Sequence, residues 1–125
     1  MEFFKEVAIK TDVKRLQDSL SIQNLAKLCA SIDNIIEDNI RSGVIYCLWG
    51  QFDINREEIV KGIRFSLPNC HNGLVWSITI EDELDEQLLI YCTINKSHHE
   101  MEFVDSIHEF VSDWQLGLEQ YFNES

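Results

Sequence analysis

Two pairs of residues, far apart in the sequence, have side chains that could bind zinc together. Cys70 and His71 are adjacent, and so are His98 and His99. Thiolates and imidazoles are common zinc ligands, and four of them complete a tetrahedral site. Ser97 to Glu100 also matches a capping box, in which both histidines belong to the first turn of a helix. We favour the helix cap and expect no cofactor, and we keep a small enzyme or metal-binding protein centred on these four residues as an alternative.

An acidic segment, EDELDE, lies between two apolar runs. Its carboxylates are Glu81, Asp82, Glu83, Asp85 and Glu86. One interpretation is a solvated turn whose charge discourages aggregation of the strands beside it. A calcium loop does not fit, because the segment lacks the D-x-[DN]-x-[DN]-G spacing and has no glycine. The remaining interpretation is a docking surface for a basic protein.

The overall charge supports a basic partner. The chain has 22 acidic and 10 basic residues, a formal net charge of −12. Lys96 is the only basic residue between positions 66 and 125, so the acidity belongs to the carboxyl-terminal half. Such a chain repels nucleic-acid backbones and anionic membranes, and we expect neither as a partner. No motif of a hydrolase, a phosphate-binding loop or a zinc protease is present, so we expect a protein that is not an enzyme.

Length and composition predict one α+β domain spanning residues 1–125. The 125 residues are 45% hydrophobic, which is enough for a core. No apolar run is long enough to span a bilayer, and the first residues do not resemble a secretory signal, so we expect a cytoplasmic protein. The four cysteines form no CxxC pair, and we expect free thiols at Cys29, Cys47, Cys70 and Cys92.

Hydrophobic spacing predicts the elements that would position these residues. Apolar residues recur every three or four positions from 11 to 41, which predicts helices with a break near 19–21. Alternation then predicts two hairpins, in which Tyr46 faces Phe65 across a turn at 53–58 and Trp76 faces Cys92 across the acidic segment. The helical pattern returns from about 97 to 122.

These elements predict a two-layer α+β sandwich. Its four-stranded antiparallel meander sheet is flanked by amino-terminal helices and a carboxyl-terminal helix. The face of the sheet opposite Trp76 is too apolar to be simply solvated, so we expect the amino-terminal helices to cover it. Alternatively it binds a partner, or a second copy of the chain, through Trp49 and Tyr91. Its predicted side chains are Ile45, Cys47, Trp49, Val60, Arg64, Val75, Ser77, Thr79, Leu89, Tyr91 and Thr93.

A small acidic sheet flanked by helices resembles two classes of bacterial protein in general character. One class is the immunity proteins, which neutralise a toxin and often present an acidic surface to a basic nuclease. The other is the type III secretion chaperones, which carry a helix between strands where this chain has only EDELDE. The first resemblance implies an inhibitor of a basic partner, and we take it as the leading hypothesis.

Overall fold

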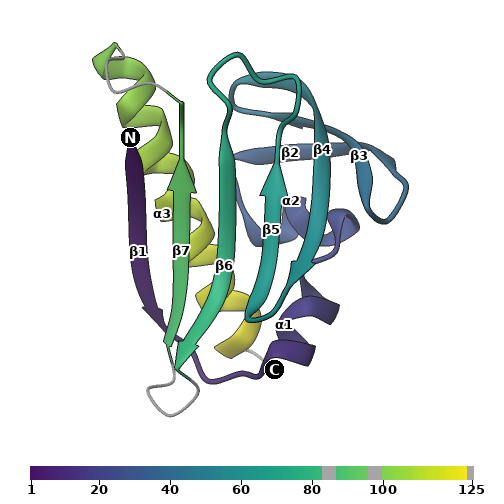
Figure 1. Ribbon diagram of the computed structural model, residues 1–125, viewed down its shortest axis with the longest axis vertical. Coiled ribbons are helices and arrows are strands. Elements are labelled where there is room, and N and C mark those ends of the chain that lie inside the picture. Colours follow the sequence, from purple (N-terminus) through teal and green to yellow (C-terminus); the bar gives the residue numbers. More distant parts are fainter. Residues whose placement is uncertain (83–86, 96–99, 124–125) are drawn as a thin grey trace.

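Seven strands, three α-helices and one 3-10 turn make up the part of the chain that the structure, a computed structural model, describes: residues 1–82, 87–95 and 100–123 (Figure 1). The elements follow the chain in this order: β1 (Glu2–Ala8), α1 (Val13–Ser19), η1 (Ile22–Asn24), α2 (Leu25–Leu28), β2 (Ile32–Asp38), β3 (Ser42–Cys47), β4 (Gly50–Ile59), β5 (Gly62–Ser66), β6 (Val75–Asp82), β7 (Gln87–Thr93) and α3 (Met101–Asn123).

The strands form one antiparallel sheet in the order β1-β7-β6-β5-β4-β3-β2. Strands β2 to β7 are a meander, and β1 pairs with β7 at the opposite edge from β2. The α+β class is therefore confirmed, but the prediction of a four-stranded sheet is wrong. The three additional strands are β1, β2 and the separate strand β4, which the prediction divided between the first strand of the first hairpin and its turn at 53–58.

All three helices lie on the same side of the sheet. Figure 1 shows α3 behind the strands, and α2 packs against it. Gly117 permits this contact, because a Cβ there would clash with the carbonyl oxygen of Leu28. Helix α1 buries Leu16, and its Arg15 guanidinium lies 5.1 Å from the centre of the Phe122 ring on α3. The expectation that the amino-terminal helices cover the second face of the sheet is therefore wrong.

Aromatic side chains from the sheet and α3 form the centre of the core. Trp76 on β6 is 1% exposed, and its ring lies edge-on to Phe110 with centroids 5.0 Å apart. Phe65 stacks on Trp76 at 5.3 Å. The predicted register of the second hairpin is confirmed, since Trp76 pairs with Cys92 and Ile80 pairs with Leu88. This register directs the opposite set of β6 and β7 side chains away from the helices.

Residues 32–38 form strand β2, although their spacing predicted a helix. Ile35 and Ile36 lie three and four positions after Ile32, as residues on one face of a helix do. The pairing of β2 with β3 shifts register twice, between Ile32 and Asn34 and between Ile35 and Glu37. Such irregularities break the two-residue alternation of a strand, so the isoleucines imitate a helical period. Isoleucine is β-branched and favours strands, which agrees with the observed element.

The first predicted hairpin is also wrong, because the chain turns earlier. The turn consists of Leu48 and Trp49, followed by Gly50 with a φ of 113°, which a residue with a side chain rarely adopts. Tyr46 consequently pairs with Gln51 rather than with Phe65. The alternation of β3 is reversed relative to the prediction: Ile45 and Cys47 are buried, whereas Tyr46 is 48% exposed.

Candidate functional site

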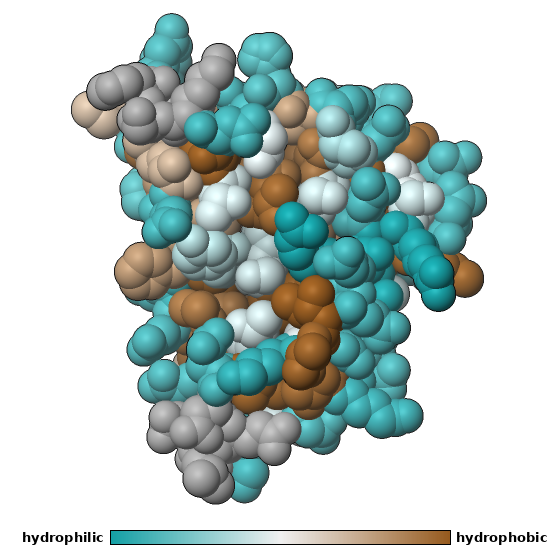
Figure 2. Space-filling view, viewed as in Figure 1, coloured by the Kyte–Doolittle hydropathy of each residue, from teal (hydrophilic) through white to brown (hydrophobic). Residues whose placement is uncertain are grey.

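The face of the sheet opposite the helices of the described residues carries a continuous row of side chains across five strands. Phe4 on β1 pairs with Tyr91 on β7, which pairs with Ser77 on β6. Ser77 pairs with Arg64 on β5, and Arg64 pairs with Glu57 on β4. We call this surface the uncovered face. Figure 2 views it directly and shows apolar patches interrupted by hydrophilic side chains.

Strand β1 places an aromatic ring between two carboxylates at the edge of the uncovered face. Alternation along the strand directs Phe3 and Val7 into the core, where they are 7% and 2% exposed. Glu2, Phe4 and Glu6 therefore project to the other side, and all three are exposed. Phe4 is 67% exposed, which is unusual for a phenylalanine and marks the start of an apolar surface.

Tyr91 interacts with the first of these carboxylates. A hydrogen bond to the Glu2 side chain raises the pKa of the Tyr91 hydroxyl, and desolvation and the negative charge of Glu2 raise it further. The hydroxyl donates this bond and the carboxylate accepts it. The Glu2 carboxylate therefore lies close enough to act on the Tyr91 hydroxyl, beside the aromatic pair of Phe4 and Tyr91.

A shallow cavity of about 200 Å³ lies next to Tyr91 on the uncovered face. Its lining mixes apolar groups with hydroxyls and one guanidinium, so it could accept the stem and head of a long polar side chain. The residues that line it are Ile59, Arg64, Val75, Trp76, Ser77, Tyr91 and Thr93.

The acidic segment begins at the end of the uncovered face. Glu81 accepts a hydrogen bond from Thr79 through its side chain, with 3.1 Å between Oγ1 and Oε1, and another from Lys61 Nζ through its carbonyl oxygen at 3.4 Å. Asp82 is the last residue of β6. The other carboxylates predicted to bind a partner, Glu83, Asp85 and Glu86, lie outside the described residues.

Trp49, predicted to share a surface with Tyr91, lies on the helix side of the sheet instead. Its ring centre is 5.1 Å from that of Phe110 and 6.2 Å from that of Phe103. The indole Nε1 donates a hydrogen bond to Ser106 Oγ at 2.8 Å. The cause is the early turn at Leu48 and Trp49, which reverses the predicted alternation. The prediction that Trp49 and Tyr91 share a surface is therefore wrong, and Phe4 is the actual neighbour of Tyr91.

Cys70 and His71 line a separate cavity of about 390 Å³ near the start of α3. Trp49, Phe52 and Phe103 form its aromatic walls. The backbone of Asn95 donates a hydrogen bond to the carbonyl oxygen of Asn72 at 2.8 Å, so the chain after β7 does approach this loop.

The zinc hypothesis needs two histidines in addition to Cys70 and His71. His98 and His99 lie outside the described residues. Within residues 1–82, 87–95 and 100–123, no three histidine, cysteine, aspartate or glutamate side chains are close enough together to hold a metal ion. A zinc site formed by all four predicted ligands therefore stays a prediction.

The four cysteines are free thiols, as predicted. Burial raises the pKa of Cys29 and of Cys92 to about 12 in each case, and it also raises the pKa of Cys47. These three thiols stay protonated at neutral pH and serve as small apolar side chains. Cys70 is half-buried and is the most accessible of the four.

Phe4, Glu2 and Glu6 were not among the predicted site residues. The signal was present in EFFKEVA, where carboxylate, ring and carboxylate alternate at positions 2, 4 and 6. This alternation forms a surface because the segment is an edge strand paired with β7.

Among the described residues, no helix is sufficiently long and apolar to cross a bilayer. No protein-family model matches the chain, and no curated protein is significantly similar to it.

Proposed function

We propose that this protein is a protein-binding module of the immunity type, which inhibits a basic partner by binding it through the uncovered face. The observation that carries the proposal is the position of Phe4, exposed on an edge strand, beside Tyr91 and between Glu2 and Glu6. We further propose that the complex forms in the cytoplasm.

The arrangement suits an arginine or lysine side chain of the partner. A guanidinium or ammonium group over an exposed aromatic ring gains about 0.5–1 kcal/mol, and more when water is excluded. Carboxylates on both sides of the ring add charge-assisted hydrogen bonds. Aromatic anchors of this kind carry much of the binding free energy at interfaces, while distributed charge speeds the encounter.

The net charge of −12 extends this preference beyond the contact residues. A basic protein approaching the sheet is attracted at long range, and raising the salt concentration weakens that attraction. The proposal moves the contact from the acidic segment, Trp49 and Tyr91, as first predicted, to Tyr91 and the neighbouring edge of the sheet. Glu81 and the residues after it then contribute mainly to steering.

A second candidate function is binding of a small molecule at the cavity beside Cys70 and His71. The observation in its favour is the combination of aromatic walls with a few polar groups, which is typical of ligand sites. Elemental analysis of the purified protein tests whether binding at this cavity involves a metal. One zinc per chain that is lost in Cys70→Ser would support the second candidate.

The test of the leading proposal is an NMR titration with a defined peptide. The probe is an acetylated and amidated peptide of alternating arginine and alanine, and the matched control has glutamate in place of arginine. The arginine peptide should shift amide signals most strongly in β1, β7 and the adjacent part of β6. Shifts concentrated in β2 and β3, or equal shifts with the glutamate peptide, would contradict the proposal.

A further inference from the structure

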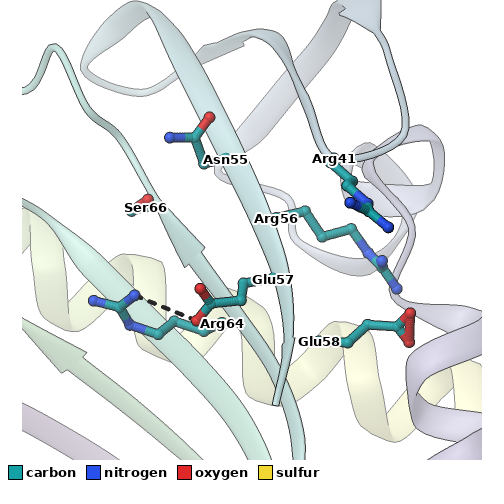
Figure 3. Close-up of a pocket in the computed structure, with 7 residues that line it drawn as sticks. All are labelled: Arg41, Asn55, Arg56, Glu57, Glu58, Arg64 and Ser66. Carbon is teal, nitrogen blue, oxygen red and sulfur yellow. Dashed lines mark ion pairs between the residues drawn. The ribbon is translucent and has the colours of Figure 1, made fainter.

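A polar groove of about 620 Å³ lies at the β4 end of the row that crosses the uncovered face. Figure 3 shows its side chains: Arg41, Arg56 and Glu58 lie toward one end, and the ion pair of Glu57 and Arg64 lies at the other. The groove is lined by Arg41, Asn55, Arg56, Glu57, Glu58, Arg64 and Ser66. Three of the ten basic residues of this acidic chain thus line one cavity.

Arg56 is held in place by neutral acceptors. Its Nε donates to the carbonyl oxygen of Leu20 at 2.8 Å, and its Nη2 donates to the carbonyl oxygen of Gln17 at 2.7 Å. These bonds fix the guanidinium at the end of α1 without neutralising its charge. Among the described residues, no acceptor takes the two hydrogens of Nη1. A preorganised guanidinium loses little conformational entropy when it binds an anion.

Arg41 reaches the same groove from a strained turn. The preceding residue, Ile40, has a φ of 75°, although it is β-branched and not glycine. Its amide donates to Asp38 Oδ1 at 2.8 Å, and the carbonyl oxygen of Arg41 accepts from the amide of Arg56 at 2.8 Å. The turn therefore fixes the backbone of Arg41 directly beside that of Arg56.

The charge of these two arginines is not balanced by an ion pair. Arg64 Nη1 forms an ion pair with Glu57 Oε1 at 3.6 Å. Among the described residues, neither Arg41 nor Arg56 has a carboxylate within ion-pair distance. Three arginines against two glutamates give the lining a formal charge of +1. Asp18 and Asp38, which share the adjoining cavity with Arg56, are not part of this lining.

We propose that the groove binds a single carboxylate group between the guanidinium groups of Arg41 and Arg56. The planar fork of arginine matches the two oxygens of a carboxylate, whereas Asn55 and Ser66 lie across β4 from the two arginines (Figure 3). Glu57 and Glu58 repel an anion of higher charge, such as phosphate, more strongly than they repel a carboxylate. This proposal uses different residues from the aromatic edge and does not depend on the proposed function.

The experiment follows the arginine side-chain signals by NMR while a carboxylate is added. The probe is the peptide acetyl-Gly-Asp-Gly-amide, titrated at constant ionic strength, and inorganic phosphate is titrated in a parallel sample. The peptide should shift the Arg41 and Arg56 guanidinium signals in a saturable manner. Arg41→Gln should lower the affinity for the peptide about tenfold, because one charge-assisted hydrogen-bonded pair is lost. Arg41→Lys should recover part of the loss, because it keeps the charge but not the planar fork.

The control variant is Lys14→Gln, which removes the same charge from the exposed surface of α1 and should leave the affinity unchanged. Arg41 is the better position to vary, because Arg56 also links β4 to α1 and its loss could disturb folding. The proposal is overturned if sodium chloride alone causes the same shifts, or if Arg41→Gln and Lys14→Gln lower the affinity for the peptide equally. Phosphate binding as tightly as the peptide would also overturn it, since the groove would then not select a carboxylate.

Discussion

Phe4 lies directly opposite Tyr91 where β1 pairs with β7, and both rings are on the face of the sheet that no helix covers. Strand β1 is an edge strand, so one side of this aromatic pair is open to solvent. Glu2 and Glu6 flank Phe4 on the same strand and the same face. This relationship is the basis of the proposed binding surface.

Replacing Phe4 should affect stability far less than replacing its neighbour Phe3. Phe4→Ala removes a ring that is 67% exposed, and we expect the free energy of unfolding to fall by less than about 1 kcal/mol. Phe3→Ala empties a core position that is 7% exposed and should cost about 3 kcal/mol. Urea denaturation of the two variants measures the difference. Equal losses would mean that Phe4 is a structural residue and not a surface anchor.

The pKa of Tyr91 should depend on Glu2. The hydrogen bond to the carboxylate stabilises the neutral phenol, so Glu2→Gln should lower the Tyr91 pKa toward the ordinary value of 10.0. The bond stabilises the fold below pH 10, and this contribution disappears as the pH rises through the raised pKa in the folded state. NMR titration of the tyrosine ring carbons resolves Tyr91 from Tyr46 and Tyr121. An unchanged Tyr91 pKa in Glu2→Gln would show that the bond is absent in solution.

Of the four thiols, Cys70 should react first with a thiol reagent such as DTNB. Cys29 and Cys92 are buried and have pKa values of about 12, so they should react only after unfolding. Because these thiols ionise near 9.0 in the unfolded chain, stability should decline as the pH rises from about 9 toward 12. One fast equivalent that disappears in Cys70→Ser is the expected result. Two or more fast equivalents in the folded protein would contradict the described core.

Relieving the strain at Ile40 should stabilise the protein. Ile40 has a φ of 75°, so Ile40→Gly relieves steric strain. The side chain is 75% exposed, so its removal sacrifices little buried apolar surface. We expect the free energy of unfolding to rise by about 0.5–1 kcal/mol. The control is Ile36→Gly on β2, where a glycine in an extended strand should lower stability. A loss of stability in both variants would argue against the left-handed turn.

The sequence predicted the carboxyl-terminal half of the fold better than the amino-terminal half. Strands β6 and β7 alternate without interruption, so Trp76 and Cys92 could be paired correctly, and α3 shows an unbroken helical period. A helix was wrongly predicted at strand β2, because its two register shifts give its isoleucines a helical spacing. The turn before Gly50 was missed because alternating apolar residues continue across it, from Val44 to Ile54, and were interpreted as a single strand.

The candidate site was predicted only in part for the same reason. Tyr91 was assigned to the correct face because the β6 and β7 register was correct. Trp49 was assigned to the wrong face because of the displaced turn. Phe4 was missed because its role depends on pairing with a strand more than eighty positions away in the sequence. Arg41 and Arg56 likewise come together only through the β2 to β4 meander.

The most direct test of the central claim compares two pairs of charge substitutions in peptide binding. Glu2→Gln with Glu6→Gln removes two carboxylates beside Phe4. Asp33→Asn with Glu37→Gln removes two exposed carboxylates from β2, at the other edge of the sheet.

The affinity of the arginine and alanine peptide is measured for both variants by fluorescence anisotropy at low and moderate salt. The account predicts that the β1 pair weakens binding about threefold to tenfold, from two exposed ion pairs, while the β2 pair has little effect. Phe4→Ala should weaken binding similarly, and added salt should not abolish that difference, because the ring contributes contact as well as charge. Equal weakening by the β1 and β2 pairs would show that only net charge matters and would contradict the assignment of the uncovered face as the binding surface.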